Sequence, residues 1–276
     1  MSTPVCLTIG SSDSSGGAGV QGDIKAFASV GCYASTVIVG VTAQTPDNLL
    51  HRHTVPVTVV ERQLDAVLDG MPCAGVKVGT TWSAELLELV GSRLRPLRER
   101  GVPVVVDPVM VTAAGSWLSS VDTAAAEVAR RLFPAATVLT PNRREAELLA
   151  GSDARTPRRE LAERIVAAGA RAVVITAGPD ERGDWFYDGH EHTHIVGNRY
   201  HTGAEHGAGC AHSAVLTGLL AHSWSLPDAV REAHRRASNG VLRGHRQVGR
   251  TNHPVDLIGL ADHAPVRDSV PPALQG

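Results

Sequence analysis

The stretch HGAGCAHSAVLTGLLA, residues 206–221, places a cysteine directly after a glycine-rich turn. Ala211, Ala214 and Val215, followed by Leu219, recur at helical spacing, so a buried helix is predicted to begin near Gly209. The first amides of a helix have no carbonyl partner within it, and the preceding glycines let a ligand come close to the backbone. We therefore predict that this turn binds an anion.

Cys210 is the residue of this turn whose side chain could accept a proton. A helix dipole favours the thiolate of a cysteine at its N-terminus, so we expect a functional thiol here. The alternative is a small buried side chain, which is the interpretation we give to Cys6, Cys32 and Cys73. An anion hole beside a proton-accepting group is what a kinase that phosphorylates an alcohol needs.

Two carboxylates follow predicted strands elsewhere in the chain. Asp107 ends the run VPVVVD, and Glu145 follows ATVLTPN after a short helix start. The carboxyl ends of parallel strands lie at one edge of a sheet, where such acids can hold Mg²⁺ directly or through water. The pair predicts a magnesium–nucleotide site, although Asn142 and Glu145 could instead form a local helix cap.

The segment between Gly10 and Asp23 is too long for a routine turn and contains GAGVQG, residues 17–22. This motif resembles a dinucleotide-binding fingerprint, but six residues separate it from the preceding strand, and the next strand ends in Gln44 rather than an acid. We therefore do not expect NAD. Asp23 either stabilises the start of a helix through the helix dipole or accepts a hydrogen bond from a polar ligand.

Composition and charge exclude several classes of protein. The net charge is −2 over 276 residues, which gives no general attraction to nucleic acid, and no apolar run reaches the length of a membrane span. The four cysteines form no C-x-x-C pair, and His190, His192 and His194 alternate as on a solvated strand face rather than as metal ligands. The N-terminus does not resemble a signal peptide. We expect a soluble, cytoplasmic protein whose substrate is a small molecule, not nucleic acid or a membrane.

Short β-branched runs alternate with helical patterns over most of the chain, which predicts an α/β fold with a mostly parallel sheet and helices on both faces. Strands are expected at 5–10, 35–43, 74–79, 102–107, 136–140 and 171–176. Helices are expected at 21–31, 57–70, 83–94, 122–133, 144–151, 158–170, 208–222 and 227–243. A hairpin is expected at 184–196. No linker or repeat is visible, so we predict one domain over 1–276, with a loosely packed tail from 246.

Six motifs together resemble the hydroxymethylpyrimidine/phosphomethylpyrimidine kinases of thiamine biosynthesis, which belong to the ribokinase-like superfamily. The motifs are LTIGSSDSSGGAGVQGDIKAF, GVTAQT, GVKVG, VVVDPVM, LTPNRREAELL and HGAGCAHSAV, in the family's order across residues 4–243. The resemblance implies a ribokinase-like three-layer sandwich, with ATP and Mg²⁺ as co-substrates. It implies 4-amino-5-hydroxymethyl-2-methylpyrimidine or its monophosphate as the phosphoryl acceptor. We also expect a homodimer.

The resemblance assigns roles to single positions of this chain. The acceptor is expected to contact Gly10, Asp23, Gln44 and Thr80. The anion hole is expected at Gly207, Ala208 and Gly209, with Cys210 as the catalytic base. The Mg–ATP side is expected to use Asp107, Asn142, Glu145 and Thr176, of which Glu145 and Asp107 serve the metal.

The chain departs from the family's pattern at three places. Thr80 stands where methionine is usual, Ala208 stands where threonine is usual, and Thr176-Ala177-Gly178-Pro179 replaces Lys-Gly-Gly-His, which removes a phosphate-binding lysine. Three alternatives therefore stay open: a pyridoxal/pyridoxine kinase, a kinase of another pyrimidine or pyridine methanol, and a non-catalytic vitamin-binding module with a decayed site.

Overall fold

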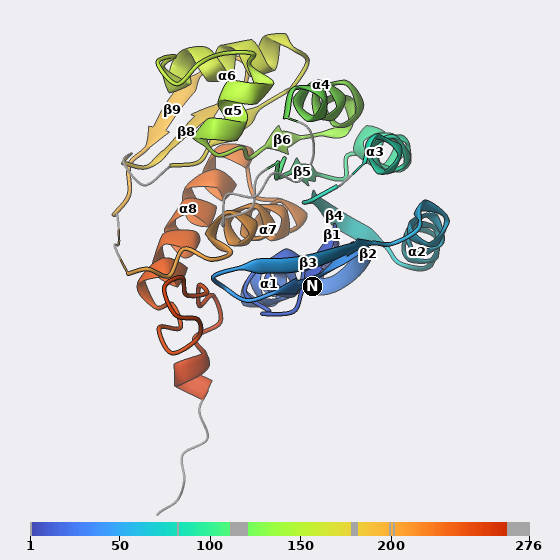
Figure 1. The fold of residues 1–276 in the computed structure, drawn as a ribbon. Helices are drawn as coiled ribbons and strands as arrows, with labels where there is room; N and C mark the ends of the chain where they lie inside the picture. The colour runs from blue at the N-terminus through green and yellow to red at the C-terminus, as the bar shows by residue number, and fades with distance from the viewer. Residues whose placement is uncertain are drawn as a thin grey trace, which may run out of the picture.

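The computed structural model describes residues 2–263 except 82, 111–120, 178–181, 199 and 201. Its strands form one nine-stranded sheet in the order β3-β2-β1-β4-β5-β6-β7-β8-β9 (Figure 1). The strands are β1 (Val5–Asp13), β2 (Tyr33–Gln44), β3 (Leu49–Thr54), β4 (Cys73–Val78), β5 (Val104–Val106), β6 (Val138–Leu139), β7 (Val173–Ile175), β8 (Asp184–Tyr187) and β9 (His192–Ile195). The central strands from β2 to β7 pair in parallel, as predicted, and β3, β8 and β9 are antiparallel additions at the two edges.

Helices cover both faces of the sheet, which confirms the predicted three layers (Figure 1). One face carries α1 (Gly19–Ser29), α7 (Ala208–Ala221) and α8 (Leu226–Leu242). The other carries α2 (Val57–Gly70), α3 (Ala84–Glu99), α4 (Val121–Leu132), α5 (Arg143–Leu149) and α6 (Arg158–Ala167). Two short 3₁₀ helices span Phe133–Ala135 and Leu260–His263. Each face has its own apolar core, since the strands between them bury side chains on both sides.

The sheet differs from the expected pattern at its first edge. β3 was not expected, because its residues LLHRHT are mostly exposed and lack an apolar alternation; it pairs antiparallel with β2 instead. β1 runs three residues further than expected, since Ser11 to Asp13 pair with Gly40 to Thr42 after a shift in register. The long turn expected between Gly10 and Asp23 is therefore partly strand.

The segment from 246, expected to be loosely packed, is tied to the rest of the chain over its first residues. The carboxylate of Asp47 accepts hydrogen bonds from the backbone amides of Arg250, Thr251 and Asn252 at 2.8 Å. The amide of Val255 donates to the carbonyl of His206 at 3.2 Å. Residues 264–276 lie outside the described part of the chain.

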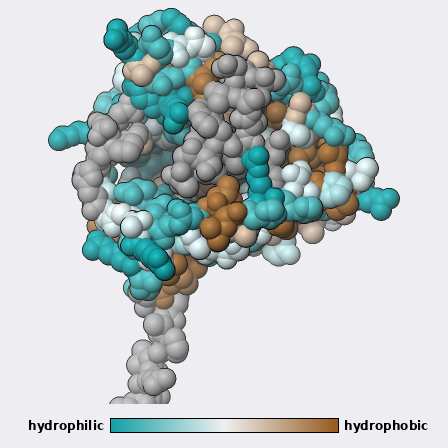
Figure 2. Space-filling view, viewed as in Figure 1, coloured by the Kyte–Doolittle hydropathy of each residue, from teal (hydrophilic) through white to brown (hydrophobic). Residues whose placement is uncertain are grey.

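The surface in Figure 2 is mostly hydrophilic on this face, with apolar residues in separate groups. Within the residues that the structure describes, no helix combines the length and the apolar character needed to cross a membrane. The hairpin expected at 184–196 is confirmed by the antiparallel pairing of β8 with β9. On β9, His192 lies 3.1 Å from Glu163, and His194 contacts the carbonyl of Arg182 at 2.6 Å.

Candidate active site

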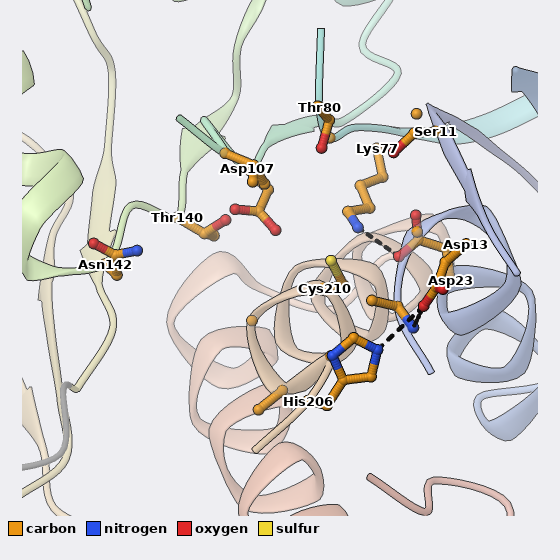
Figure 3. Close-up of a pocket in the computed structure, with 18 of the residues that line it drawn as sticks. Ser11, Asp13, Asp23, Lys77, Thr80, Asp107, Thr140, Asn142, His206 and Cys210 are labelled. Carbon is orange, nitrogen blue, oxygen red and sulfur yellow. Dashed lines mark hydrogen bonds and ion pairs between the residues drawn. The ribbon is translucent and has the colours of Figure 1, made fainter. Parts of the chain in front are cut away.

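A cavity of about 420 Å³ opens at the carboxyl edge of the parallel strands, where α1 and α7 begin. The sequence-predicted site residues all line this cavity: Gly10, Asp23, Gln44, Thr80, Asp107, Asn142, Glu145, Thr176, Gly207, Ala208, Gly209 and Cys210. In Figure 3 the side chains of Asp107 and Asn142 face the cavity from one side, and those of Asp13 and Asp23 lie on the other. Cys210 lies between these two groups. The chain thus presents two sets of polar groups with a thiol between them.

The N-terminus of α7 forms the floor between the two groups. Gly207 precedes the helix in the left-handed region, with φ of 82°, and a Cβ there would collide with the carbonyl of Gly17. This close contact between the starts of α1 and α7 is the packing role of the GAGVQG motif. A Cβ at Gly209 would meet no atom within 4 Å, so this position faces open space.

One of the three amides expected in the anion hole is engaged within the protein. The amide of Ala208 donates to the carbonyl of Glu205 at 3.0 Å, so it is already used. The amides of Gly209 and Cys210 follow in the first turn of α7, where no intrahelical carbonyl can pair with them. The amides of Gly209 and Cys210 are therefore available to an anion at this turn.

The thiol of Cys210 is partly exposed to the cavity, and its electrostatic surroundings oppose ionisation. Burial raises its pKa to about 12; the charge of Lys77 and the amide of Gly19 act in the opposite direction, while the carboxylates of Asp107 and Asp23 add to the rise. Burial thus opposes the thiolate that the N-terminus of α7 was expected to favour.

Asp23 lies in the cavity wall but is almost fully buried, with 1% of its surface exposed. Its Oδ1 accepts a hydrogen bond from Nζ of Lys77 at 2.5 Å, and its Oδ2 accepts one from the hydroxyl of Thr8 at 2.6 Å. Burial alone would lower the pKa of Lys77, but the charges of Asp23 and Asp107 outweigh burial and raise it. Both oxygens of Asp23 are thus hydrogen-bonded within the protein, and one of them binds the ammonium of Lys77.

The opposite side of the cavity carries two neighbouring buried acids. Asp107 accepts a hydrogen bond from the hydroxyl of Ser213 at 2.9 Å, and burial raises its pKa. Burial and the charge of Asp107 raise the pKa of Glu145 to about 8. Glu145 and Asn142 also form the capping box of α5, so the local interpretation of this pair is confirmed.

These two acids fit a divalent cation. The charge of Asp107 raises the pKa of Glu145, and a cation that lies between two such carboxylates or binds through water would stabilise both; oxygen ligands of this kind suit Mg²⁺. Within the described residues, no three His, Cys, Asp or Glu side chains converge on one point. A magnesium ion here would therefore keep most of its waters or take further ligands from nucleotide phosphates.

The remaining predicted residues lie at the cavity rim. The backbone of Gln44 exchanges hydrogen bonds with the hydroxyl of Ser14 at 2.7 and 2.8 Å, which fixes the end of β2. Its side-chain Oε1 accepts one long hydrogen bond, of 3.4 Å, from the hydroxyl of Thr42. Thr176 follows β7, and its amide donates to the carbonyl of Pro141 at 2.9 Å. Gly178 and Pro179, where the family's lysine motif is altered, lie outside the described residues.

Sequence reasoning missed several polar residues of the cavity, among them Lys77, Asp13 and His206. Lys77 could have been found as a lone charge inside the buried strand β4, since an unpaired lysine is almost never fully buried. Asp13 and His206 lie 193 positions apart, and Oδ2 of Asp13 contacts Nε2 of His206 at 3.1 Å. No local sequence pattern predicts that contact.

A mostly parallel α/β sheet, with a helix N-terminus between two sets of polar side chains at its carboxyl edge, is typical of a phosphotransferase that acts on a small molecule. The family model described as phosphomethylpyrimidine kinase matches residues 13–256. The chain belongs to that family.

Individual relatives agree with this assignment. The hydroxymethylpyrimidine/phosphomethylpyrimidine kinase of Rhizobium meliloti is 35% identical over 92% of this chain and 96% of its own length. The thiamine biosynthesis bifunctional protein ThiED of Geobacter sulfurreducens is 37% identical over 95% of this chain, which spans 53% of that protein. The crystal structure of an ADP complex of Bacillus subtilis pyridoxal kinase is similar with a TM-score of 0.83 and 29% identity, over 94% of this chain and 99% of that one.

Proposed function

We propose that this protein is an ATP-dependent kinase of thiamine biosynthesis. It transfers the γ-phosphoryl group of ATP to the hydroxymethyl group of 4-amino-5-hydroxymethyl-2-methylpyrimidine, or phosphorylates the monophosphate of that alcohol. The observation that carries this proposal is the position of Cys210, at the N-terminus of α7, between Asp107 on one side of the cavity and Asp23 on the other. Membership of the phosphomethylpyrimidine kinase family supports the acceptor class.

The acceptor binds on the β1–β2 side. The Gln44 amide can donate to a ring nitrogen and accept from an exocyclic amine at once, which suits an aminopyrimidine. Gly10 has no side chain, so a flat ring can lie against the backbone, and Thr80 lines the same wall. Asp23 serves this side through Lys77, whose ammonium it holds at the edge of the sheet.

The nucleotide binds on the opposite side, along Asn142 and Thr176. Asp107 and Glu145 would hold Mg²⁺, which would neutralise phosphate charge. The amides of Gly209 and Cys210 bind the phosphoryl oxygens as negative charge develops on them. Cys210 lies where the attacking hydroxyl must approach. The ATP-side roles, the magnesium ion, the homodimer and the cytoplasmic location stay predictions.

One experiment tests the whole proposal. Purified protein is incubated with Mg–ATP and, in turn, the aminopyrimidine alcohol, its monophosphate, pyridoxal and pyridoxine, and both ADP release and product mass are measured. We expect a gain of one phosphate on the pyrimidine alcohol or its monophosphate. Phosphorylation of pyridoxal alone would replace the proposed acceptor, and the similarity to Bacillus subtilis pyridoxal kinase makes this the main rival.

Two glycine variants test the anion hole. Gly209→Val fills the open space at the start of α7 and should abolish ADP release. Gly70→Val is the matched control, because a Cβ there also meets no atom within 4 Å, and Gly70 ends α2 away from the cavity. Thermal stabilisation of the wild type by the pyrimidine without ADP release would favour a non-catalytic binding module.

A further inference from the structure

The cavity that we assign to the two substrates has an acidic lining. Among its described residues, the acids are Asp13, Asp23, Asp107, Glu145 and Glu205. Lys77 and Arg144 are the lysine and arginine side chains of the same lining. The phosphates of a nucleotide are negative, and each carboxylate near them opposes binding unless a cation offsets its charge. The positions of the two cations therefore bear directly on where phosphates can bind.

Lys77 belongs to the acceptor side of the cavity. It is 1% exposed, and its Nζ lies 2.5 Å from Oδ1 of Asp23. In Figure 3 this pair lies across the cavity from Asn142. A movement of the ammonium toward a phosphate would leave the Asp23 carboxylate buried without its cation, which is costly. Among the described lining residues, the cationic side chain on the nucleotide side is therefore that of Arg144.

Arg144 stands in the first turn of α5, directly before Glu145, and its side chain is exposed to solvent where it borders the cavity. The capping box fixes the backbone at this point. Oδ1 of Asn142 accepts from the amide of Glu145 at 3.0 Å, and Oε2 of Glu145 accepts from the amide of Asn142 at 2.9 Å. The start of the side chain is thus held in place, while its charged end can be reached by a ligand from the cavity.

Thr176 lies beside this turn and contributes no charge. It pairs with Asn142 in an isolated parallel bridge, and its hydroxyl donates to the carbonyl of Pro141 at 3.4 Å. Position 176 is also where this chain lacks the lysine of the family's pattern. Because Thr176 adjoins Asn142, two residues before Arg144, a cation at 176 and a cation at 144 would serve the same part of the cavity.

We propose, on the basis of the proposed kinase function, that Arg144 binds the phosphates of the nucleotide and supplies the positive charge that Thr176 lacks. Its guanidinium donates paired N–H groups to phosphate oxygens, since the planar fork of arginine matches the geometry of a phosphate. This contact increases the affinity for ATP. It leaves the acceptor on the Gln44 side unaffected, because the two groups lie on different strands and sides of the cavity.

Arg144→Gln tests the contact directly, because it removes the charge and keeps a polar side chain. We expect the Kd for Mg–ATP, measured by titration calorimetry without acceptor, to rise roughly 10- to 100-fold. Arg159→Gln is the matched control: Arg159 is an exposed arginine at the start of α6 that pairs with Glu163 and lies outside the cavity lining. A rise for Arg144→Gln no larger than for Arg159→Gln would overturn the proposal.

A second variant separates phosphate binding from a structural role of Arg144. Adding Thr176→Lys to Arg144→Gln brings an ammonium to the same part of the cavity from another strand, and it should recover most of the lost affinity for ATP. A structural defect at the start of α5 would not be repaired from β7. No recovery in a folded double variant would therefore also overturn the proposal.

The same variants distinguish this inference from the proposed function. In steady-state assays, Arg144→Gln should raise the KM for ATP and leave the KM for the pyrimidine alcohol unchanged. If wild-type protein neither binds Mg–ATP nor phosphorylates any of the alcohols, the proposed function falls and this inference with it. If the wild type is active and Arg144→Gln binds ATP equally well, only the inference falls.

Discussion

The ammonium of Lys77 and the carboxylate of Asp23 form a hydrogen-bonded ion pair at 2.5 Å, with both side chains almost fully buried. The pair joins the carboxyl end of β4 to the first turns of α1, 54 positions apart in the chain. Desolvating two charges is costly unless they are well paired, so the site must keep both members. The charge of Lys77 also acts to lower the pKa of Cys210 and of Asp107, against the effect of burial.

Replacing Lys77 by Met should therefore destabilise the fold strongly. The substitution leaves the Asp23 carboxylate buried without its cation, and we expect a loss of about 3–5 kcal/mol in the free energy of unfolding, measured with urea. Lys25→Met is the matched control, since Lys25 is the chain's other lysine and donates only to the carbonyl of Gly16. Adding Asp23→Asn to Lys77→Met should recover part of the loss. Equal stability of the two lysine variants would contradict this account.

Gln44→Leu should weaken binding of the acceptor and leave binding of ATP unaffected. Leucine can neither donate nor accept, so the polar edge of the pyrimidine would be buried unpaired, at about 1–3 kcal/mol per group. The acceptor KM should rise by roughly one to two orders of magnitude, with the KM for ATP unchanged, in steady-state assays of ADP release. Gln63→Leu is a control of the same chemistry, because Gln63 bonds the backbone of Ile38 on another part of β2. If only the KM for ATP changed, the assignment of the acceptor to the Gln44 side of the cavity would be wrong.

Cys210 should become more reactive when a neighbouring charge is removed. The carboxylate of Asp107 contributes to the raised pKa of the thiol, so Asp107→Asn should lower that pKa and speed alkylation by iodoacetamide at pH 7.5. The rate is followed by mass spectrometry of the peptide that contains Cys210. Cys73 serves as the internal reference, since it is also partly exposed and its pKa is raised by burial alone. Unchanged alkylation of Cys210 relative to Cys73 would show that Asp107 does not control the thiol.

A buried cluster behind α7 should make stability depend on pH. Nδ1 of His234 lies 2.9 Å from Oδ2 of Asp184; burial would lower the pKa of His234, but Asp184 outweighs burial and raises it. A histidine with a raised folded pKa stabilises the protein fully below its unfolded value of 6.5, and this contribution is lost as pH rises through the folded pKa. The stability difference between wild type and His234→Gln, measured by urea unfolding, should therefore shrink between pH 5.5 and 9.

The control for this pH dependence is His51→Gln, because His51 is exposed on β3. Its stability difference from wild type should stay constant over the same range. A difference for His234→Gln that grows with pH would mean that Asp184 does not hold the charged imidazole.

Much of the fold was predictable because the central strands are continuous apolar runs. The parallel strands, the hairpin and helices such as α2 and α7 lie within a few residues of their expected bounds. Their periodicity is local, so it can be seen along the chain. β3 could not be predicted in this way, because an exposed edge strand with the sequence LLHRHT needs no apolar alternation; only its pairing with β2 defines it.

The sequence by itself also determined which residues gather at one edge of the sheet, since parallel strands end on the same side and residues such as Asp107 and Gln44 follow those ends. What only the tertiary structure decided is how these groups pair. Asp23 is engaged by Lys77, and Asp13 by His206, across 54 and 193 positions of the chain. Such contacts depend on strand order and on how closely α1 and α7 pack. Those are properties of the assembled core, and no local spacing encodes them.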